Sequence, residues 1–217
     1  MVKRGFSSLI LIFLWVGFAH SGVTKIQPLQ LGPLQLPPGV KFKGKFVAGV
    51  HWLDNLGENI IILSKFGPFP SKSDRSMPDE EVMDAELHAY HYLKAKGKFA
   101  LLWQTFDFVR GCPFDLDLNF LPKSLTITDL DKNGIAESTF LYKLACRSDV
   151  SPAVLKLIMH EGQKKYAIRG DTVVTVAPGE KMGGTKKIDP AFAKAPKVFQ
   201  DFAVKRWQAL VEEKFGE

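Results

Sequence analysis

Residues 86–109 read ELHAYHYLKAKGKFALLWQTFDFV and contain two apolar, aromatic runs, Glu86–Leu93 and Phe99–Val109, joined by a short segment that contains the turn Lys94–Gly97. Runs of this length that are rich in aromatic residues are typical of strands. The connection is too short for parallel strands, which need a crossover of a dozen residues or more. The stretch therefore predicts a β-hairpin and an antiparallel fold.

The same pattern continues on both sides of this hairpin. Further tight turns stand at Asp54–Gly57, Asn133–Gly134 and Glu161–Gly162, and each separates short apolar runs. We therefore predict a mainly β protein, an antiparallel β-meander arranged as a sandwich or like part of a propeller, and not a βαβ fold. The other expected strands are Phe46–Leu53, Asn59–Lys65, Asp115–Phe120, Leu125–Thr128, Ser138–Leu144, Val154–His160 and Lys165–Arg169.

Two segments depart from this pattern. Between Phe199 and Val211, apolar residues follow helical spacing, which predicts a C-terminal helix packed on one sheet face. The alternative is a helix that binds a membrane surface or a partner. Near the other end, residues 22–45 are rich in Pro, Leu and Gln and are expected to be extended, as a spacer or an edge segment. Residues 46–217 are then a single β-rich domain that includes the helix.

The N-terminus has the three parts of a secretory signal peptide. A short cationic start is followed by the apolar stretch Phe6–Phe18 and by the small residues Ala19 and Ser21. A membrane anchor is the alternative, but spanning needs about 20 apolar residues. We therefore predict a signal peptide over residues 1–21 and a mature chain without a transmembrane segment, located in the periplasm, secreted or at the cell surface.

Composition and charge exclude several classes of protein. The chain is 46% hydrophobic and 24% charged, which argues against disorder and against a multi-pass membrane protein. Without the predicted leader it has 27 Lys and Arg against 23 Asp and Glu, a net charge of only +4. So mild an excess argues against a nucleic-acid partner.

The chain has two cysteines, Cys112 and Cys146. An even number of cysteines in an exported chain predicts a disulfide. The alternative is a nucleophilic cysteine beside a histidine.

Residues 129–137, which we call the acidic loop, read DLDKNGIAE. Oxygen-bearing side chains stand at positions 1, 3, 5 and 9, and a glycine stands at position 6, where the chain must turn. Ca²⁺ takes six to eight oxygen ligands in a flexible cage, so alternate side chains of a tight loop suit it. The alternative is a metal-free Asn-Gly turn. The predicted calcium ligands are Asp129, Asp131, Asn133, the backbone carbonyl of Ile135, and Glu137. The acidic loop resembles the Asp-rich hairpin of integrin-type propeller repeats more than an EF-hand, because its flanks are predicted strands.

Five stretches together resemble an exported bacterial family labelled surface polysaccharide biosynthesis proteins. They are Trp52–Ile60, Cys112–Asp115, Thr128–Glu137, Cys146–Pro152 and Lys165–Gly170. The resemblance implies a protein of the bacterial cell envelope connected with surface polysaccharide or lipopolysaccharide, and it implies no particular reaction.

We therefore expect an envelope-associated accessory or binding protein whose partner is an envelope glycan or an envelope protein, without catalytic residues. The alternative is a hydrolase or transferase acting on envelope glycan, which would need convergent carboxylates in a cleft, for example from Asp107, Asp115 or Asp117.

Overall fold

The hairpin at residues 86–109 forms one side of a five-stranded antiparallel sheet, sheet A, in a computed structural model that describes residues 26–72 and 82–213. Its strands are β4 (Met83–Ala95) and β5 (Lys98–Cys112), and β5 is one of the two edge strands of the sheet. The strand order β1-β2-β3-β4-β5 follows the sequence, as expected for a meander. The predicted antiparallel pairing is therefore confirmed.

A second antiparallel sheet, sheet B, has the order β13-β10-β9-β8-β6, and β7 also pairs with β8. β11 and β12 form a separate hairpin. The remaining strands of sheet A are β1 (Leu29–Gln30), β2 (Lys45–Asp54) and β3 (Gly57–Pro70). Those of sheet B are β6 (Asp115–Phe120), β7 (Thr126–Thr128), β8 (Glu137–Arg147), β9 (Val154–Glu161), β10 (Lys164–Asp171) and β13 (Lys186–Ile188). The other elements are β11 (Val173–Ala177), β12 (Glu180–Gly183), the 3-10 helices η1 (Pro33–Gln35) and η2 (Pro190–Lys194), and α1 (Lys197–Leu210).

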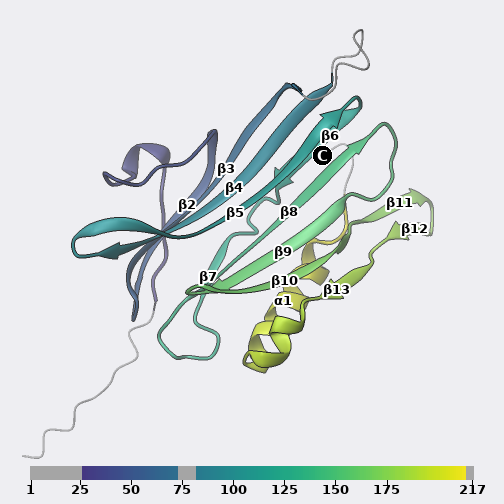
Figure 1. The fold of residues 1–217 in the computed structure, drawn as a ribbon. Coiled ribbons are helices and arrows are strands. Elements are labelled where there is room, and N and C mark those ends of the chain that lie inside the picture. Colours follow the sequence, from purple (N-terminus) through teal and green to yellow (C-terminus); the bar gives the residue numbers. More distant parts are fainter. Residues whose placement is uncertain (1–25, 73–81, 214–217) are drawn as a thin grey trace, which may run out of the picture.

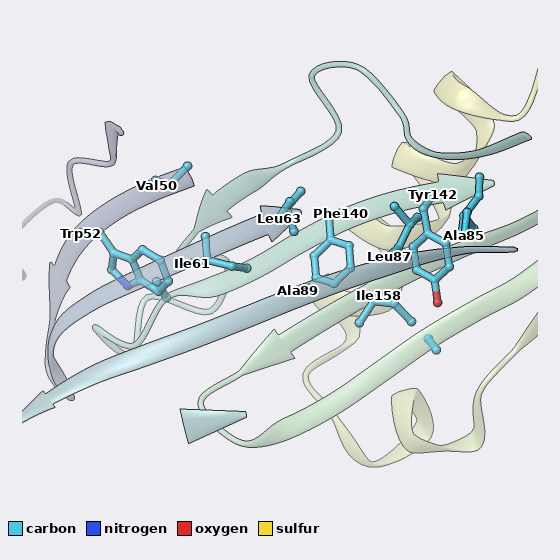
Figure 2. Packing of buried hydrophobic residues seen from close by; sticks show 13 residues of the cluster. Val50, Trp52, Ile61, Leu63, Ala85, Leu87, Ala89, Phe140, Tyr142 and Ile158 are labelled. Atoms are coloured by element: carbon cyan, nitrogen blue, oxygen red, sulfur yellow. The ribbon is translucent and has the colours of Figure 1, made fainter. Parts of the chain in front are cut away.

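The two sheets face each other across one hydrophobic core, so the fold is a sandwich. Trp52, Ile61 and Leu87 of sheet A meet Phe140 and Ile158 of sheet B in one cluster of buried side chains (Figure 2). Phe140 is fully buried at the centre, beside the ring of Trp103. Burial of each such side chain contributes about 1.5–3 kcal/mol.

The C-terminal helix packs on the outer face of sheet B. α1 lies against β9 and β10 (Figure 1). Its buried residues Phe199, Ala203 and Trp207 are four apart, which places them on one side of the helix. They pack with Leu157 and Ile168 of the sheet. The predicted packing of this helix is confirmed.

The Pro/Leu/Gln-rich segment covers the outer face of sheet A. Its residues Leu31 and Leu36 pack on Ile60 and Ile62, and its short strand β1 pairs with β2. The Tyr92 hydroxyl donates a hydrogen bond to the Lys41 carbonyl at 2.5 Å. This segment is therefore part of the packed structure and not a spacer.

A short stretch before the helix contains strands that the sequence analysis missed. β11 and β12 pair around Pro178–Gly179, and β13 adds to the edge of sheet B beside β10. Most of the connection between β3 and β4, residues 73–81, lies outside the described residues. Among the residues that the structure describes, no helix is long and apolar enough to cross a membrane. The predicted signal peptide also lies outside the described residues.

Cys112 and Cys146 form a disulfide, as predicted, and it joins the end of β5 to β8 across the two sheets. The bridge spans 34 residues of sequence, and closing a loop of that length stabilises a fold by about 3–4 kcal/mol through the unfolded chain. We expect the double variant Cys112→Ser/Cys146→Ala to lose about this free energy of unfolding in urea denaturation. Reduced wild-type protein should match the variant, and equal midpoints for oxidised and reduced protein would contradict this account.

Candidate metal site

The acidic loop connects β7 to β8 and is shaped by its own side chains. The Asp131 Oδ1 atom accepts a hydrogen bond from the Asn133 N–H at 3.2 Å, and the Asn133 Oδ1 atom accepts one from the Ile135 N–H at 2.7 Å. The Asp129 Oδ2 atom accepts a third from the Gly134 N–H at 3.2 Å. Such side-chain to backbone bonds are typical of Asx turns and hold the loop in a tight curve.

This curve brings three of the five predicted ligands together. Asp129, Asp131 and Glu137 each offer a carboxylate oxygen, and these oxygens lie within 4.8 Å of one another. Glu137 is the first residue of β8, so a rigid strand holds one side of the group. The three acids therefore converge as the spacing of the loop predicts.

Two carboxylate oxygens in this group are buried without a hydrogen-bond partner. Glu137 has no exposed surface; its Oε2 atom accepts bonds from the Thr128 hydroxyl and the Leu130 N–H, both at 3.0 Å. The Oε1 atom of Glu137 and the Oδ1 atom of Asp129 accept no hydrogen bond from any described residue. Leaving a buried charged oxygen unpaired costs several kcal/mol, so native proteins pair such groups or bind a metal with them.

A further carboxylate lies on the neighbouring strand. Glu161 of β9 stands directly opposite Glu137 in the strand register and is 8% exposed. Directly opposed side chains lie on the same face of a sheet, and like charges in this position destabilise it. The sequence alone does not single out Glu161, because its place beside the acidic loop depends on the pairing of β8 with β9.

The buried carboxylate of Glu137 is costly to ionise without a cation. Burial raises the pKa of Glu137 from 4.5 to about 7, although hydrogen bonds from Leu130 and Thr128 oppose the shift. A divalent cation would reverse this effect, because its charge favours the ionised carboxylate. All of these donors are oxygen atoms, which suits Ca²⁺ or Mg²⁺ and not a soft metal.

Asn133, a further predicted ligand, connects the acids to the turn through its side-chain amide. Its amide oxygen is engaged by the Ile135 N–H, and its amide nitrogen donates to Glu161 Oε1 at 2.7 Å and to Asp131 Oδ2 at 3.1 Å. In this arrangement Asn133 orients the acids and holds the turn. The backbone carbonyl of Ile135 remains a predicted ligand that no contact in the structure tests.

The turn between β2 and β3 docks onto the acidic loop. Asp54 Oδ2 accepts a hydrogen bond from the Ala136 N–H at 3.1 Å, and the Asn55 N–H donates to the Gly134 carbonyl at 2.8 Å. Gly134 has a φ of +79°, and a Cβ atom there would stand 2.1 Å from the Asn55 side chain. Sheet A therefore fixes the position of the loop, and glycine at this point avoids both backbone strain and displacement of the Asn55 side chain.

A row of buried aromatic rings continues from this contact into the core. Trp52, whose indole N–H donates to Asp54, lies with its ring 5.1 Å from that of His91. The centre of the Trp103 ring is 5.3 Å from that of the His91 ring. The Trp103 ring also stacks on the His160 ring, with 3.9 Å between the two ring centres. Both histidines are buried, and burial lowers the pKa of His91 to about 4 and that of His160 to about 3.

This row predicts a loss of stability in acid. His91 is kept neutral in the fold, so protons bind preferentially to the unfolded chain below its ordinary pKa of about 6.5. The contribution of neutral His91 to the free energy of unfolding is fully present above pH 6.5 and is lost as the pH falls towards 4. The shift in the pKa of His91 corresponds to about 3 kcal/mol. Urea denaturation at pH 7 and pH 4.5 measures the loss.

The matched variant for this test is His91→Gln, which keeps a polar group beside Asn59 and cannot titrate. The wild-type chain should lose about 2–3 kcal/mol more than the variant between the two pH values. Equal losses in the two proteins would show that His91 does not govern the acid sensitivity.

The carboxylates named for a glycan-cleaving enzyme have separate surroundings. Asp107 pairs with Lys156, and Asp117 pairs with Lys143 at 2.7 Å. Asp115 is exposed at the start of β6. An acid and base pair must converge on one bond, so ion pairing with different lysines gives the enzyme alternative no support.

No protein family model, curated protein or solved structure matches this chain.

Proposed function

We propose that the protein is an exported accessory or binding protein of the bacterial cell envelope, stabilised by Ca²⁺ in the acidic loop. The observation that carries the proposal is the buried, unpartnered Oε1 atom of Glu137 beside Asp129 and Asp131. A cation there would offset the cost of desolvating these carboxylates.

Ca²⁺ would have a structural role. The acidic loop lies between the two sheets at the point where the β2–β3 turn docks, so a bound ion would hold both in place. Asp129, Asp131 and Glu137 would hold the ion, with the Ile135 carbonyl as a further ligand. Ca²⁺ is preferred over Mg²⁺ because a loop of carboxylates and backbone oxygen suits its larger, flexible coordination shell.

The export part of the proposal is supported by the disulfide and the leader. The Cys112–Cys146 bridge is compatible with an oxidising compartment, where such bonds form and persist. The predicted signal peptide at residues 1–21 and the resemblance to exported surface polysaccharide proteins agree with that location.

For the partner we favour an envelope glycan. Aromatic rings suit sugar rings, and the outer face of β5 presents Phe106 and Phe108, 47% and 46% exposed, with ring centres 5.4 Å apart. The Arg110 guanidinium lies 4.6 Å from the centre of the Phe108 ring, and its hydrogen bond to Glu86 at 2.7 Å fixes its position beside that ring. Among the described residues no Trp or Tyr side chain is exposed at the loops. The choice of a glycan as partner therefore rests on Phe106 and Phe108.

A glycan array tests this proposal. Wild-type protein with its disulfide intact is screened against bacterial surface polysaccharides in 2 mM Ca²⁺ and in chelator, beside the double variant Phe106→Ser/Phe108→Ser. Leu101→Ser is the matched control, because Leu101 is 48% exposed on the same strand. Binding that the double variant loses and the control keeps supports the proposal. Absence of binding, or equal binding by all three proteins, contradicts a glycan partner on β5.

A further inference from the structure

A side pocket with a volume of about 470 Å³ opens between the two sheets, at the end of β6 and away from the residues of the acidic loop. One wall is formed by Val47 and Ala48 of β2 and by Leu63 of β3. The opposite wall is the connection from β6 to β7, residues 120–125. The volume is in the range of about 300–1,000 Å³ in which proteins bind small molecules.

A β-bulge shapes the first wall. Successive residues of a regular strand point to opposite faces, yet Val47 and Ala48 both line the pocket. The register between β2 and β3 shifts between Phe46 and Ala48, so Val47 is the extra residue. Bulges re-aim side chains and are frequent next to binding sites.

The opposite wall is held in a strained turn. Lys123 has a φ of +56°, which is uncommon for a residue with a side chain. Arg206 of α1 donates to the carbonyls of Lys123 and Ser124, at 3.1 and 3.3 Å. The buried Ser124 hydroxyl donates to the Leu141 carbonyl of β8 at 3.1 Å. Because α1 and β8 both fix this turn, the pocket is preformed.

The lining is apolar except for three residues, Gln30, Lys123 and Ser124. Ser124 is engaged as described, but the side chains of Lys123 and Gln30 make no hydrogen bond or ion pair with any residue that the structure describes. Both are exposed at the rim. The site thus combines apolar walls with one free cation and one free amide at its mouth.

From these features we infer that the side pocket binds an amphipathic anion with a single alkyl chain, such as a fatty acid or an alkyl phosphate. The chain lies against Val47, Leu63, Phe120 and Leu125, and the anionic head accepts hydrogen bonds from Lys123 and Gln30. The apolar walls supply affinity through burial of methylene groups, about 0.8 kcal/mol each. The single ammonium selects an anionic head over an uncharged one.

Isothermal titration calorimetry tests the inference with three probes, dodecanoate, dodecyl phosphate and dodecanol, each below its micelle or solubility limit. The mature protein with its disulfide is used in calcium-free buffer, because the lining contains no residue of the acidic loop. If none of the three probes binds, the calcium proposal is therefore unaffected. We expect one binding site, with both anions at least 10-fold tighter than dodecanol. The tighter of the two anions shows whether the head is a carboxylate or a phosphate.

Substitutions locate the site. Ala48→Trp fills the pocket and should abolish binding of all three probes. Lys123→Gln should weaken the anions about 10-fold and leave dodecanol unchanged. The matched control is Lys96→Gln, because Lys96 is also an exposed lysine with a positive φ, of +50°, but lies in the β4–β5 turn. This control should bind as the wild type does.

If Ala48→Trp does not fold, Val47→Glu replaces it. Val47 is 47% exposed at the rim, so a carboxylate there is tolerated and repels the anionic head. Two results would overturn the inference: no heat of binding with the wild type at millimolar anion, or binding that neither pocket variant reduces.

Discussion

Replacement of Asp54 by Ala is expected to lower the free energy of unfolding by about 4 kcal/mol. The Asp54 carboxylate accepts four hydrogen bonds, from the N–H groups of Leu56 and Ala136, the Trp52 indole and the Asn59 amide, at 2.9–3.1 Å. Trp52 and Ala136 are buried, so their donors would be left unpaired, and the buried Asn59 amide would keep only its bond to the Gly57 carbonyl. Each such donor costs about 1–3 kcal/mol.

Urea denaturation of the variant and the wild type measures this loss. Asp115→Ala is the matched control, because Asp115 is exposed on β6, and it should change stability by less than about 0.5 kcal/mol. A cost below about 1 kcal/mol for Asp54→Ala would show that the β2–β3 turn does not anchor the acidic loop.

Saturating Ca²⁺ is expected to raise the melting temperature by about 5–10 °C. An ion at 100 times its dissociation constant stabilises the fold by about 2.7 kcal/mol, and for a chain of this size each kcal/mol corresponds to about 2–4 °C. Differential scanning calorimetry in chelator and in millimolar Ca²⁺ measures the shift. Mg²⁺ at the same concentration should give a smaller one.

The variant Glu137→Gln separates the ion from the fold. We expect it to lose the Ca²⁺ response and yet to be at least as stable as the wild type in chelator, because it removes a buried charge opposite Glu161. A variant that is destabilised in chelator and still shifted by Ca²⁺ would contradict the assignment of Glu137.

Much of the sandwich is predictable because its strands carry local signals. The hairpin Glu86–Val109 shows both apolar runs and a tight turn, and β4 and β5 extend these runs by only a few residues at their ends. The strand β6 has the predicted limits, Asp115–Phe120. The helix is predictable because Phe199, Ala203 and Trp207 repeat at helical spacing.

The missed strands lack such signals. β12 is fully exposed, and β13 is only three residues long, so neither has an alternating apolar pattern to reveal it. Their pairing is determined by neighbours, because β13 joins β10 at the sheet edge. Local sequence therefore could not indicate them.

The acidic loop could likewise be predicted only in part. Its spacing alone predicts the convergence of Asp129, Asp131 and Glu137, since a tight turn orients alternate side chains towards one centre. The approach of Asp54 to Ala136 spans 82 residues, and that of Glu161 to Asn133 depends on strand pairing. These contacts are tertiary, so they could be found only from the structure.

Calorimetric titration of Ca²⁺ into the disulfide-bonded protein tests the central claim most directly. We predict one ion per chain, with a dissociation constant below 1 mM, in the wild type and in the control Asp115→Asn, and no heat of binding in Glu137→Gln. No binding by the wild type at millimolar Ca²⁺, or equal binding by Glu137→Gln, would contradict a calcium site in the acidic loop.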